Sequence, residues 1–181
     1  ATSWSAAKSF TSALIGLAIE QGYIGSVDDK ACEYLDKWSC EEIVCLSLDC
    51  PLSRPNISIR DILEMRSGLS PTDGISIYSD KDDQLRHSLE RSILTEPGTV
   101  YLYSNEDSMI LSAVINTTTG LTAKDYAEKE LFSKINMVGD WWTDKEGHTM
   151  TYCCIDTTPR DFARFGLLYA RSGKWNGQQI I

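Results

Sequence analysis

The sequence predicts a helix-rich globular domain with little strand. Apolar residues recur at i, i+3 and i+4 spacing in several segments, which is the pattern of amphipathic helices. The chain has 181 residues, of which 42% are hydrophobic and 24% charged, a composition typical of folded rather than disordered proteins. This length is sufficient for one domain whose buried core needs no metal for stability.

The first predicted helix runs from Ser5 to Glu20. Its apolar residues recur at helical spacing, and further isoleucines widen the apolar face, so we expect this helix to be buried on most sides. Ser3 is a candidate N-cap, and Gly22 is a candidate C-terminal stop. A short helical turn is predicted over residues 31–38.

The next stretch, Cys40 to Pro55, is rich in cysteine, and its two prolines argue against a long helix. We therefore expect a disulfide-stapled loop over about residues 40–55. The chain has six cysteines, including the adjacent pair Cys153 and Cys154. No C-x-x-C pair occurs, and His87 and His148 are not spaced as metal ligands and are expected to be exposed, so the sequence predicts no metal site.

Five later helices are predicted, over residues 57–65, 84–94, 105–118, 122–132 and 159–170. Ser58 and Asp61 match a capping box at the start of the first of these, and Pro159 suits the first turn of the last. The polar stretch over residues 70–83 is expected to be a surface loop. The Asn-Gly pair in Trp175–Gln178 predicts a β-hairpin.

The chain is acidic, with 17 Lys and Arg against 26 Asp and Glu, a net charge of −9. This balance disfavours a nucleic acid or an anionic membrane surface as a partner. The apolar stretch Ala13–Ile19 is far short of the ~20 residues of a spanning helix, so no membrane span is expected. Two N-glycosylation sequons, at Asn56 and Asn116, together with the clustered cysteines favour a secreted, periplasmic or lumenal location. A cytoplasmic protein with buried thiols is the alternative, and no oligomeric state is predicted.

Ser5 and Lys8 form a Ser-x-x-Lys motif at the start of the first predicted helix. Positions i and i+3 share a helix face, so the Lys8 amine can reach the Ser5 hydroxyl. The helix dipole favours negative charge at this end and disfavours a protonated lysine, and a dry site lowers the lysine pKa further. A neutral lysine can then activate serine as a nucleophile without histidine. Taken alone, the motif is better explained as a helix start carrying an exposed lysine.

Tyr103 and Asn105 form a Tyr-x-Asn motif after a Pro-Gly turn, at the start of another predicted helix. A tyrosine beside an ammonium group can shuttle a proton to a leaving group. An asparagine two residues later can hold Lys8 or a substrate amide. A core tyrosine is the alternative interpretation, but it does not explain why both motifs occur in this order.

These motifs resemble those of the serine β-lactamase-related, penicillin-recognition hydrolases. That group includes class C β-lactamases, D-alanyl-D-alanine carboxypeptidases, related carboxylesterases and 6-aminohexanoate-dimer hydrolases. Further similar segments are Val27–Lys30, Ile59–Leu63 with Arg66–Leu69, Glu96–Thr99, Thr158–Gly166 and Gly173–Gly177. The resemblance therefore spans residues 1–181. It implies an α+β fold of the β-lactamase/transpeptidase type, of which this chain is mostly the helical part, with most of the antiparallel sheet missing.

By this resemblance, Ser5 is the acylated nucleophile, Lys8 its base partner and Tyr103 a proton shuttle. Asn105 is a positioning or substrate-binding residue. The resemblance does not decide whether Lys8 or Tyr103 acts as the base. No metal or organic cofactor is implied.

The sequence also departs from the family pattern. The family's third motif, Lys/His-x-Gly on a sheet strand near the C-terminus, has no counterpart on such a strand. That strand normally supplies one of the two amides that stabilise the oxyanion, and losing one such donor costs on the order of 10²–10³ in rate. Cys153 and Cys154 stand where relatives tend to have glycine. We therefore interpret the chain as a fragment of a larger hydrolase domain, and activity of this piece alone is in doubt.

The predicted function is that of a serine hydrolase that forms an acyl-enzyme. The predicted substrate is a small molecule with an amide or ester group: a β-lactam, a D-alanyl peptide, an aminohexanoate-type linear amide or a small ester. The alternative is a non-catalytic extracellular binding or structural protein on the same scaffold.

Overall fold

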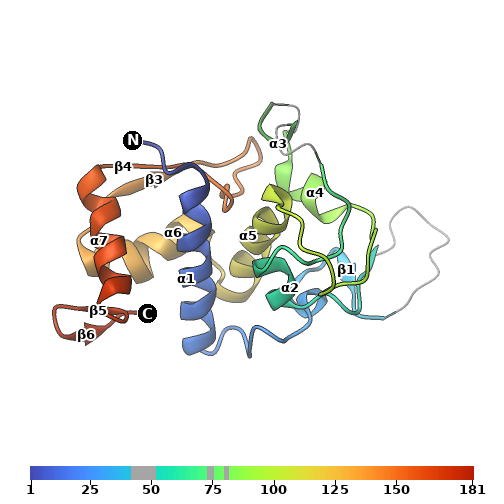
Figure 1. Ribbon diagram of the computed structural model, residues 1–181, viewed down its shortest axis with the longest axis horizontal. Coiled ribbons are helices and arrows are strands. Elements are labelled where there is room, and N and C mark those ends of the chain that lie inside the picture. Colours follow the sequence, from blue (N-terminus) through green and yellow to red (C-terminus); the bar gives the residue numbers. More distant parts are fainter. Residues whose placement is uncertain (42–51, 73–75, 80–81) are drawn as a thin grey trace.

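The computed structural model describes residues 1–41, 52–72, 76–79 and 82–181, and it is predominantly helical (Figure 1). The α-helices are α1 (Ala7–Glu20), α2 (Ile59–Leu63), α3 (Ser76–Ser79), α4 (Gln84–Leu89), α5 (Asn105–Thr119), α6 (Ala123–Ala127) and α7 (Pro159–Ala170). Single turns of other helix types are η1 (Trp4–Ala6), η2 (Ala31–Tyr34), η3 (Glu128–Phe132) and η4 (Ser133–Ile135). Among the described residues, no helix is both long and apolar enough to cross a membrane.

The strands of the described residues form three small sheets of two strands each. Strands β1 (Trp38–Ser39) and β2 (Leu52–Ser53) are parallel, with Trp38 opposite Leu52. Strands β3 (Gly139–Trp141) and β4 (Ile155–Thr157) are antiparallel, with Trp141 opposite Ile155. Strands β5 (Lys174–Trp175) and β6 (Gln178–Gln179) form the hairpin predicted from the Asn-Gly pair.

The first three residues of the chain lie against β4. Thr157 donates a backbone hydrogen bond to Ala1 and accepts one from its amino group, and Ser3 donates to Ile155 at 2.9 Å. The side chain of Ser3 accepts a hydrogen bond from the Ile155 amide at 2.9 Å. Ser3 stands at the predicted N-cap position, but its side chain caps no helix, because its hydroxyl accepts from the Ile155 amide of β4.

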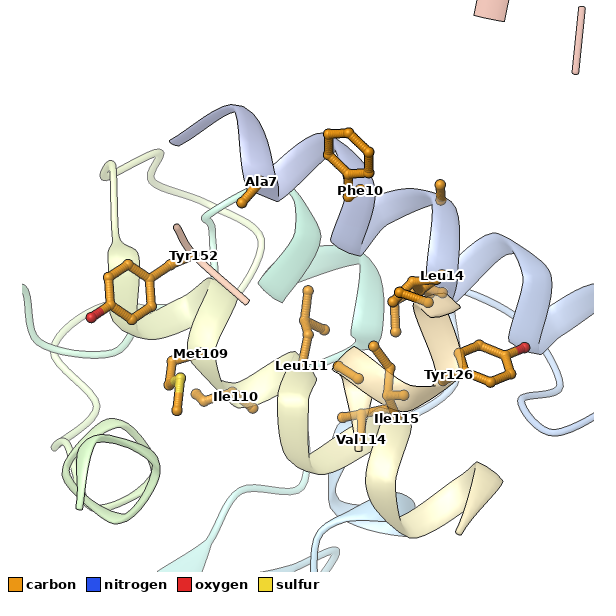
Figure 2. Packing of buried hydrophobic residues seen from close by; sticks show 14 of the residues in the cluster. Ala7, Phe10, Leu14, Met109, Ile110, Leu111, Val114, Ile115, Tyr126 and Tyr152 are labelled. Atoms are coloured by element: carbon orange, nitrogen blue, oxygen red, sulfur yellow. The ribbon is translucent and has the colours of Figure 1, made fainter. Parts of the chain in front are cut away.

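Helix α1 lies between α5 and α7 and forms the centre of the core (Figure 1). On the α5 side, apolar side chains of the two helices face one another (Figure 2). On the α7 side, the Phe10 ring stacks on Phe165 with 3.6 Å between centroids. Because α1 is buried on two faces, its position is fixed by packing along most of its length, as its wide apolar face predicts.

The predicted helices all exist, and they differ from the predictions mainly at their ends. The helix over residues 159–170 has the predicted bounds, and the capping box of Ser58 and Asp61 is present. The helices predicted over residues 57–65 and 84–94 are shorter, and residues 128–132 of the predicted 122–132 helix form a π-helical turn. The stretch over residues 70–83, predicted as a loop, contains the short helix α3.

Two disulfides lie within the described residues, Cys32–Cys40 and Cys153–Cys154. The first confirms that the cysteine-rich stretch is stapled at its beginning. Residues 42–51, with Cys45 and Cys50, lie outside the described residues. Asn56 and Asn116 are both exposed, and their glycosylation stays a prediction.

Gly68 is required by a close approach of two backbone segments. Its φ is 76°, and a Cβ at this position would collide with the carbonyl oxygen of Thr95. We expect Gly68→Ala to lower the free energy of unfolding by about 2–4 kcal/mol, since the positive φ and the collision both cost stability. Gly120→Ala is the matched control, because Gly120 has φ 72° but no atom within 4 Å of the added Cβ. It should cost only about 1–2 kcal/mol. Equal losses in urea unfolding would show that the collision has no effect.

Candidate active site

Ser5 lies in η1, immediately before α1, and its side chain is exposed. The preceding residue, Trp4, has φ 47° and a 63% exposed side chain. A left-handed conformation costs a residue other than glycine roughly 1–2 kcal/mol. Such strain persists only where the surroundings enforce it, and it clusters at functional sites. Here the pairing of Ser3 with β4 and the start of α1 hold the chain on both sides of Trp4.

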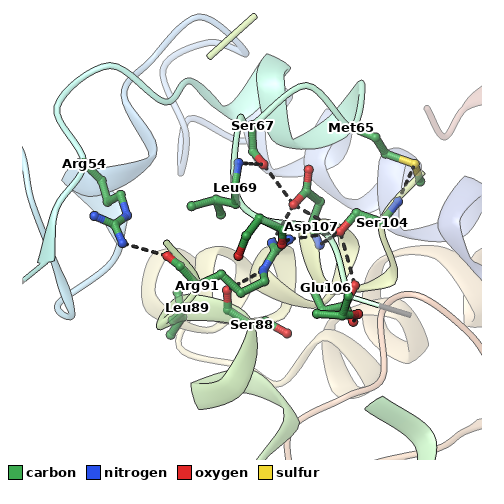
Figure 3. Close-up of polar contacts among 12 residues, drawn as sticks. Arg54, Met65, Ser67, Leu69, Ser88, Leu89, Arg91, Ser104, Glu106 and Asp107 are labelled. Carbon is green, nitrogen blue, oxygen red and sulfur yellow. Dashed lines mark hydrogen bonds and ion pairs between the residues drawn. The ribbon is translucent and has the colours of Figure 1, made fainter. Parts of the chain in front are cut away.

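Tyr103 and Asn105 are held by the N-terminus of α5. Ser104 between them is the N-cap, and its hydroxyl accepts a hydrogen bond from the Asp107 amide at 2.9 Å. The Asp107 carboxylate also accepts from Arg91 at 2.6 Å, and both side chains of this pair are almost fully buried (Figure 3). The backbone entering the helix is therefore anchored by a buried ion pair and a cap, which fixes the direction of the two motif side chains.

The structure brings the four predicted site residues together. The Ser5 hydroxyl lies 2.6 Å from the Tyr103 hydroxyl and 3.2 Å from the Lys8 amine. The Lys8 amine donates to the Asn105 side-chain oxygen at 2.8 Å. It also lies over the Tyr103 ring, 4.9 Å from the centroid. Ser5 and Tyr103 are exposed, whereas Asn105 is buried beneath them, where it contacts Lys8.

A further member of the site is a backbone atom, the carbonyl oxygen of Tyr152. It accepts a hydrogen bond from the Lys8 amine at 2.8 Å. Motif reasoning missed it, because a backbone acceptor requires no particular side chain and leaves no signal in the sequence. Two pure acceptors, on Asn105 and Tyr152, thus take two hydrogens of the Lys8 amine. In a neutral amine this leaves the lone pair for the third neighbour, the Ser5 hydroxyl.

The electrostatics of the site shift the pKa values of Lys8 and Tyr103. Burial lowers the pKa of Lys8 below its ordinary value, although contact with Tyr103 and the charge of Glu106 oppose this. Burial alone would raise the pKa of Tyr103, but hydrogen bonding to Lys8 and Ser5 and the positive charge of Lys8 outweigh it, so the pKa is lowered. Both shifts make it easier for these groups to give up a proton, which suits proton transfer between them and Ser5.

A groove of about 480 Å³ runs between α1 and α7 and reaches Lys8. Its lining residues are Lys8, Ser9, Ser12, Phe165, Gly166 and Tyr169. A separate cavity of about 410 Å³ lies beside η2 and α4, and its lining includes none of Ser5, Lys8 and Tyr103. The groove between α1 and α7 is therefore a cavity that adjoins the candidate site.

His148 lies beside the second cavity with Asp83 and Asp144, and their ligand atoms lie within 4.8 Å of one another. These groups already have partners: Asp144 accepts from the Gln84 and His148 amides, and Asp83 caps α4. We therefore do not assign a metal to them. His87 and His148 are partly buried, contrary to the prediction that both are exposed.

Lys145-Glu-Gly147 is the one Lys-x-Gly in the sequence. It lies in the turn between Asp144 and His148 rather than on a strand. The Lys145 amine pairs with Asp82 at 2.5 Å. This segment therefore does not serve as the third motif of the site.

The chain resembles several solved structures in its fold. The chain is similar to a candidate 6-aminohexanoate-dimer hydrolase from Bacillus anthracis, with 21% identity and a TM-score of 0.78 over 98% of this chain and 49% of that one. A penicillin binding protein from Bacillus halodurans is 18% identical, with a TM-score of 0.70 over 94% of this chain and 60% of that one. A class C beta-lactamase is 19% identical, with a TM-score of 0.69 over 96% of this chain and 50% of that one.

These similarities confirm the predicted β-lactamase/transpeptidase-like fold, and the chain spans about half the length of the solved structures it resembles. No match is found among curated proteins. The family model for Beta-lactamase matches residues 2–175. Because that match covers nearly all of the sequence, the chain belongs to the beta-lactamase family.

Proposed function

We propose that this protein is a serine hydrolase that transfers an acyl group from an amide or ester to Ser5 and then to water. The observation that supports this most directly is the position of the Ser5 hydroxyl, within hydrogen-bonding distance of both the Tyr103 hydroxyl and the Lys8 amine. A serine nucleophile needs an adjacent group that takes its proton, and here two such groups are in reach.

The first half of the reaction forms the acyl-enzyme. The Ser5 oxygen attacks the carbonyl carbon of the substrate, and its proton passes to the Lys8–Tyr103 pair. The tetrahedral intermediate collapses when the bond to the leaving nitrogen or oxygen breaks. Tyr103 is exposed on the side open to solvent and delivers the proton to that leaving atom.

The second half releases the product. A water molecule gives a proton to the Lys8–Tyr103 pair and attacks the acyl carbon. The ester bond to Ser5 breaks, the serine oxygen regains its proton, and the carboxylic acid leaves. Asn105 and the Tyr152 carbonyl hold the Lys8 amine in the same place during both halves, because both are acceptors for either protonation state of lysine.

The related proteins indicate a range of substrates rather than one. Their names include an aminohexanoate-dimer hydrolase, a penicillin binding protein and a class C beta-lactamase. All three names are consistent with a carbonyl that an activated serine can attack. We therefore propose a small-molecule amide or ester as substrate, with no metal or organic cofactor.

Covalent labelling of Ser5 tests the proposal. A fluorophosphonate probe should label the full-length protein, and Ser5→Ala should abolish the labelling, since a phosphonylated serine requires an activated hydroxyl. Ser133→Ala is the matched control, because Ser133 is an exposed serine in η4 that does not line the groove beside the candidate site, and this variant should label normally. Labelling that persists in Ser5→Ala would contradict the assignment. No labelling of the wild-type protein would favour a binding role on the same scaffold.

A further inference from the structure

The adjacent cysteines Cys153 and Cys154 form a disulfide directly after Tyr152, whose carbonyl holds Lys8. A bond between neighbouring residues closes a small ring that includes the peptide unit between them. Both side chains are buried, at 0% and 1% exposure. The disulfide ring is therefore buried next to the candidate active site and does not lie on the protein surface.

The segment that carries the ring lies between α1 and α5 and makes hydrogen bonds to both helices. The Thr151 hydroxyl donates to the Ser108 carbonyl of α5 at 2.6 Å. The Thr151 carbonyl accepts from Thr11 of α1 at 2.7 Å, and the next carbonyl, that of Tyr152, accepts from Lys8. These two successive carbonyls thus accept from donors that lie about one helical turn apart on α1. This arrangement requires a specific backbone path at Tyr152 and at the ring that follows.

The ring also fixes the strand that leads back to the nucleophile. Cys154 has φ 75°, a conformation that residues other than glycine adopt only when they are held in it. Its carbonyl accepts from the Trp142 amide at 3.0 Å, and the Cys153 carbonyl accepts from the Trp141 indole at 2.9 Å. The next residue, Ile155, pairs with Ser3, two residues before the nucleophile.

We propose that the Cys153–Cys154 ring is a positioning element of the catalytic site. By fixing the turn between Tyr152 and Ile155, it aligns the carbonyl that holds Lys8 with the strand that holds Ser3. The inference rests on the proposed function, because it assigns a role in the alignment of Ser5 and Lys8. Both cysteines are positioning residues, since neither contacts the reacting hydroxyl.

Two variants that remove the disulfide separate its covalent role from the turn conformation. Cys153→Ala with Cys154→Ala removes the ring and leaves an alanine at φ 75°. Cys153→Ala with Cys154→Gly also removes the ring, but its glycine accepts that φ without strain. Cys32→Ala with Cys40→Ala is the control, because it removes the second disulfide of the described residues, which contacts none of Ser5, Lys8 and Tyr103.

The readout is turnover of a chromogenic ester by the full-length protein, after mass spectrometry has located the Cys153–Cys154 bond. We expect both ring-free variants to lose about 10- to 100-fold in kcat with KM changed little, since small displacements of a catalytic group have effects of this size. The glycine variant should recover thermal stability but not kcat. The control should retain kcat. The proposal would be overturned if Cys153 and Cys154 were free thiols in the wild-type protein. Wild-type kcat in the glycine variant would also overturn it.

A second readout does not depend on activity. Titration of isotope-labelled Lys8 by NMR should give a higher pKa in the alanine variant than in the wild-type protein, because opening the turn reduces the burial that lowers the pKa. An unchanged pKa would count against the ring as a positioning element. If the wild-type protein neither labels nor turns over substrate, the proposed function fails, and this titration alone decides the role of the ring.

Discussion

Lys8→Arg should reduce kcat/KM by about 10²–10⁴-fold, the usual contribution of a positioned acid–base group. Arginine keeps the positive charge next to Tyr103 but does not lose a proton in proteins, so it cannot accept the proton of Ser5. Because arginine matches only the protonated form of Lys8, the loss would show that the neutral amine is required. Steady-state kinetics on a chromogenic ester is the measurement.

The pH profile adds a second criterion to this substitution. In the wild-type protein, kcat/KM should fall as the pH drops through the pKa of Lys8, which burial has lowered. In the Lys8→Arg variant, kcat/KM should not show this fall at low pH. Lys124→Arg is the control, because Lys124 pairs with Asp140 on the surface and should show no effect. Activity of Lys8→Arg within about threefold of wild type would assign the base to Tyr103 instead.

Asp107→Ala should lower the free energy of unfolding by about 3–5 kcal/mol, because it leaves the buried Arg91 guanidinium without its counter-ion. For a domain of this size, the loss corresponds to a decrease in Tm of roughly 6–20 °C. The same carboxylate accepts from Ser67 at 3.0 Å and helps hold the Ser104 cap, so Tyr103 should also lose its alignment. Thermal unfolding and ester turnover measure the two effects separately.

The control removes both charges at once. Arg91→Met with Asp107→Leu replaces the pair by apolar side chains of similar size, and such exchanges are often neutral for stability. We expect this double variant to regain most of the Tm while kcat stays low, because the Ser104 hydroxyl loses its contacts with the Arg91 and Asp107 side chains. A double variant as unstable as Asp107→Ala would show that the network depends on polar contacts other than the ion pair.

Local patterns in the sequence predicted the helices well, and they predicted the contact between Ser5 and Lys8. Helix α7 begins at Pro159 and ends at Ala170 as expected, since its capping residue and its periodicity are both local features. Ser5 meets Lys8 through one turn of helix, which the spacing of three residues already implies. That Tyr103 lies beside them was implied by the family resemblance and not by spacing.

The missed features depend on contacts between distant segments. Ser3 has the residue type of an N-cap, but its hydroxyl binds the Ile155 amide, a partner 152 positions away. Tyr152 contributes a carbonyl oxygen that any residue could supply. The predicted loop over residues 70–83 contains α3, whose four residues are too few for a recognisable helical period.

The geometry of the site has a consequence for how the chain acquires activity. The Ser5–Tyr103 contact joins residues 98 positions apart, and the Lys8–Tyr152 contact joins residues 144 positions apart. Such contacts form late in folding, since the chain must close long loops before any of them is gained. A chain in which these loops have not yet closed therefore lacks both contacts. On the proposed function, Ser5 would therefore react with substrate only in molecules in which both contacts have formed.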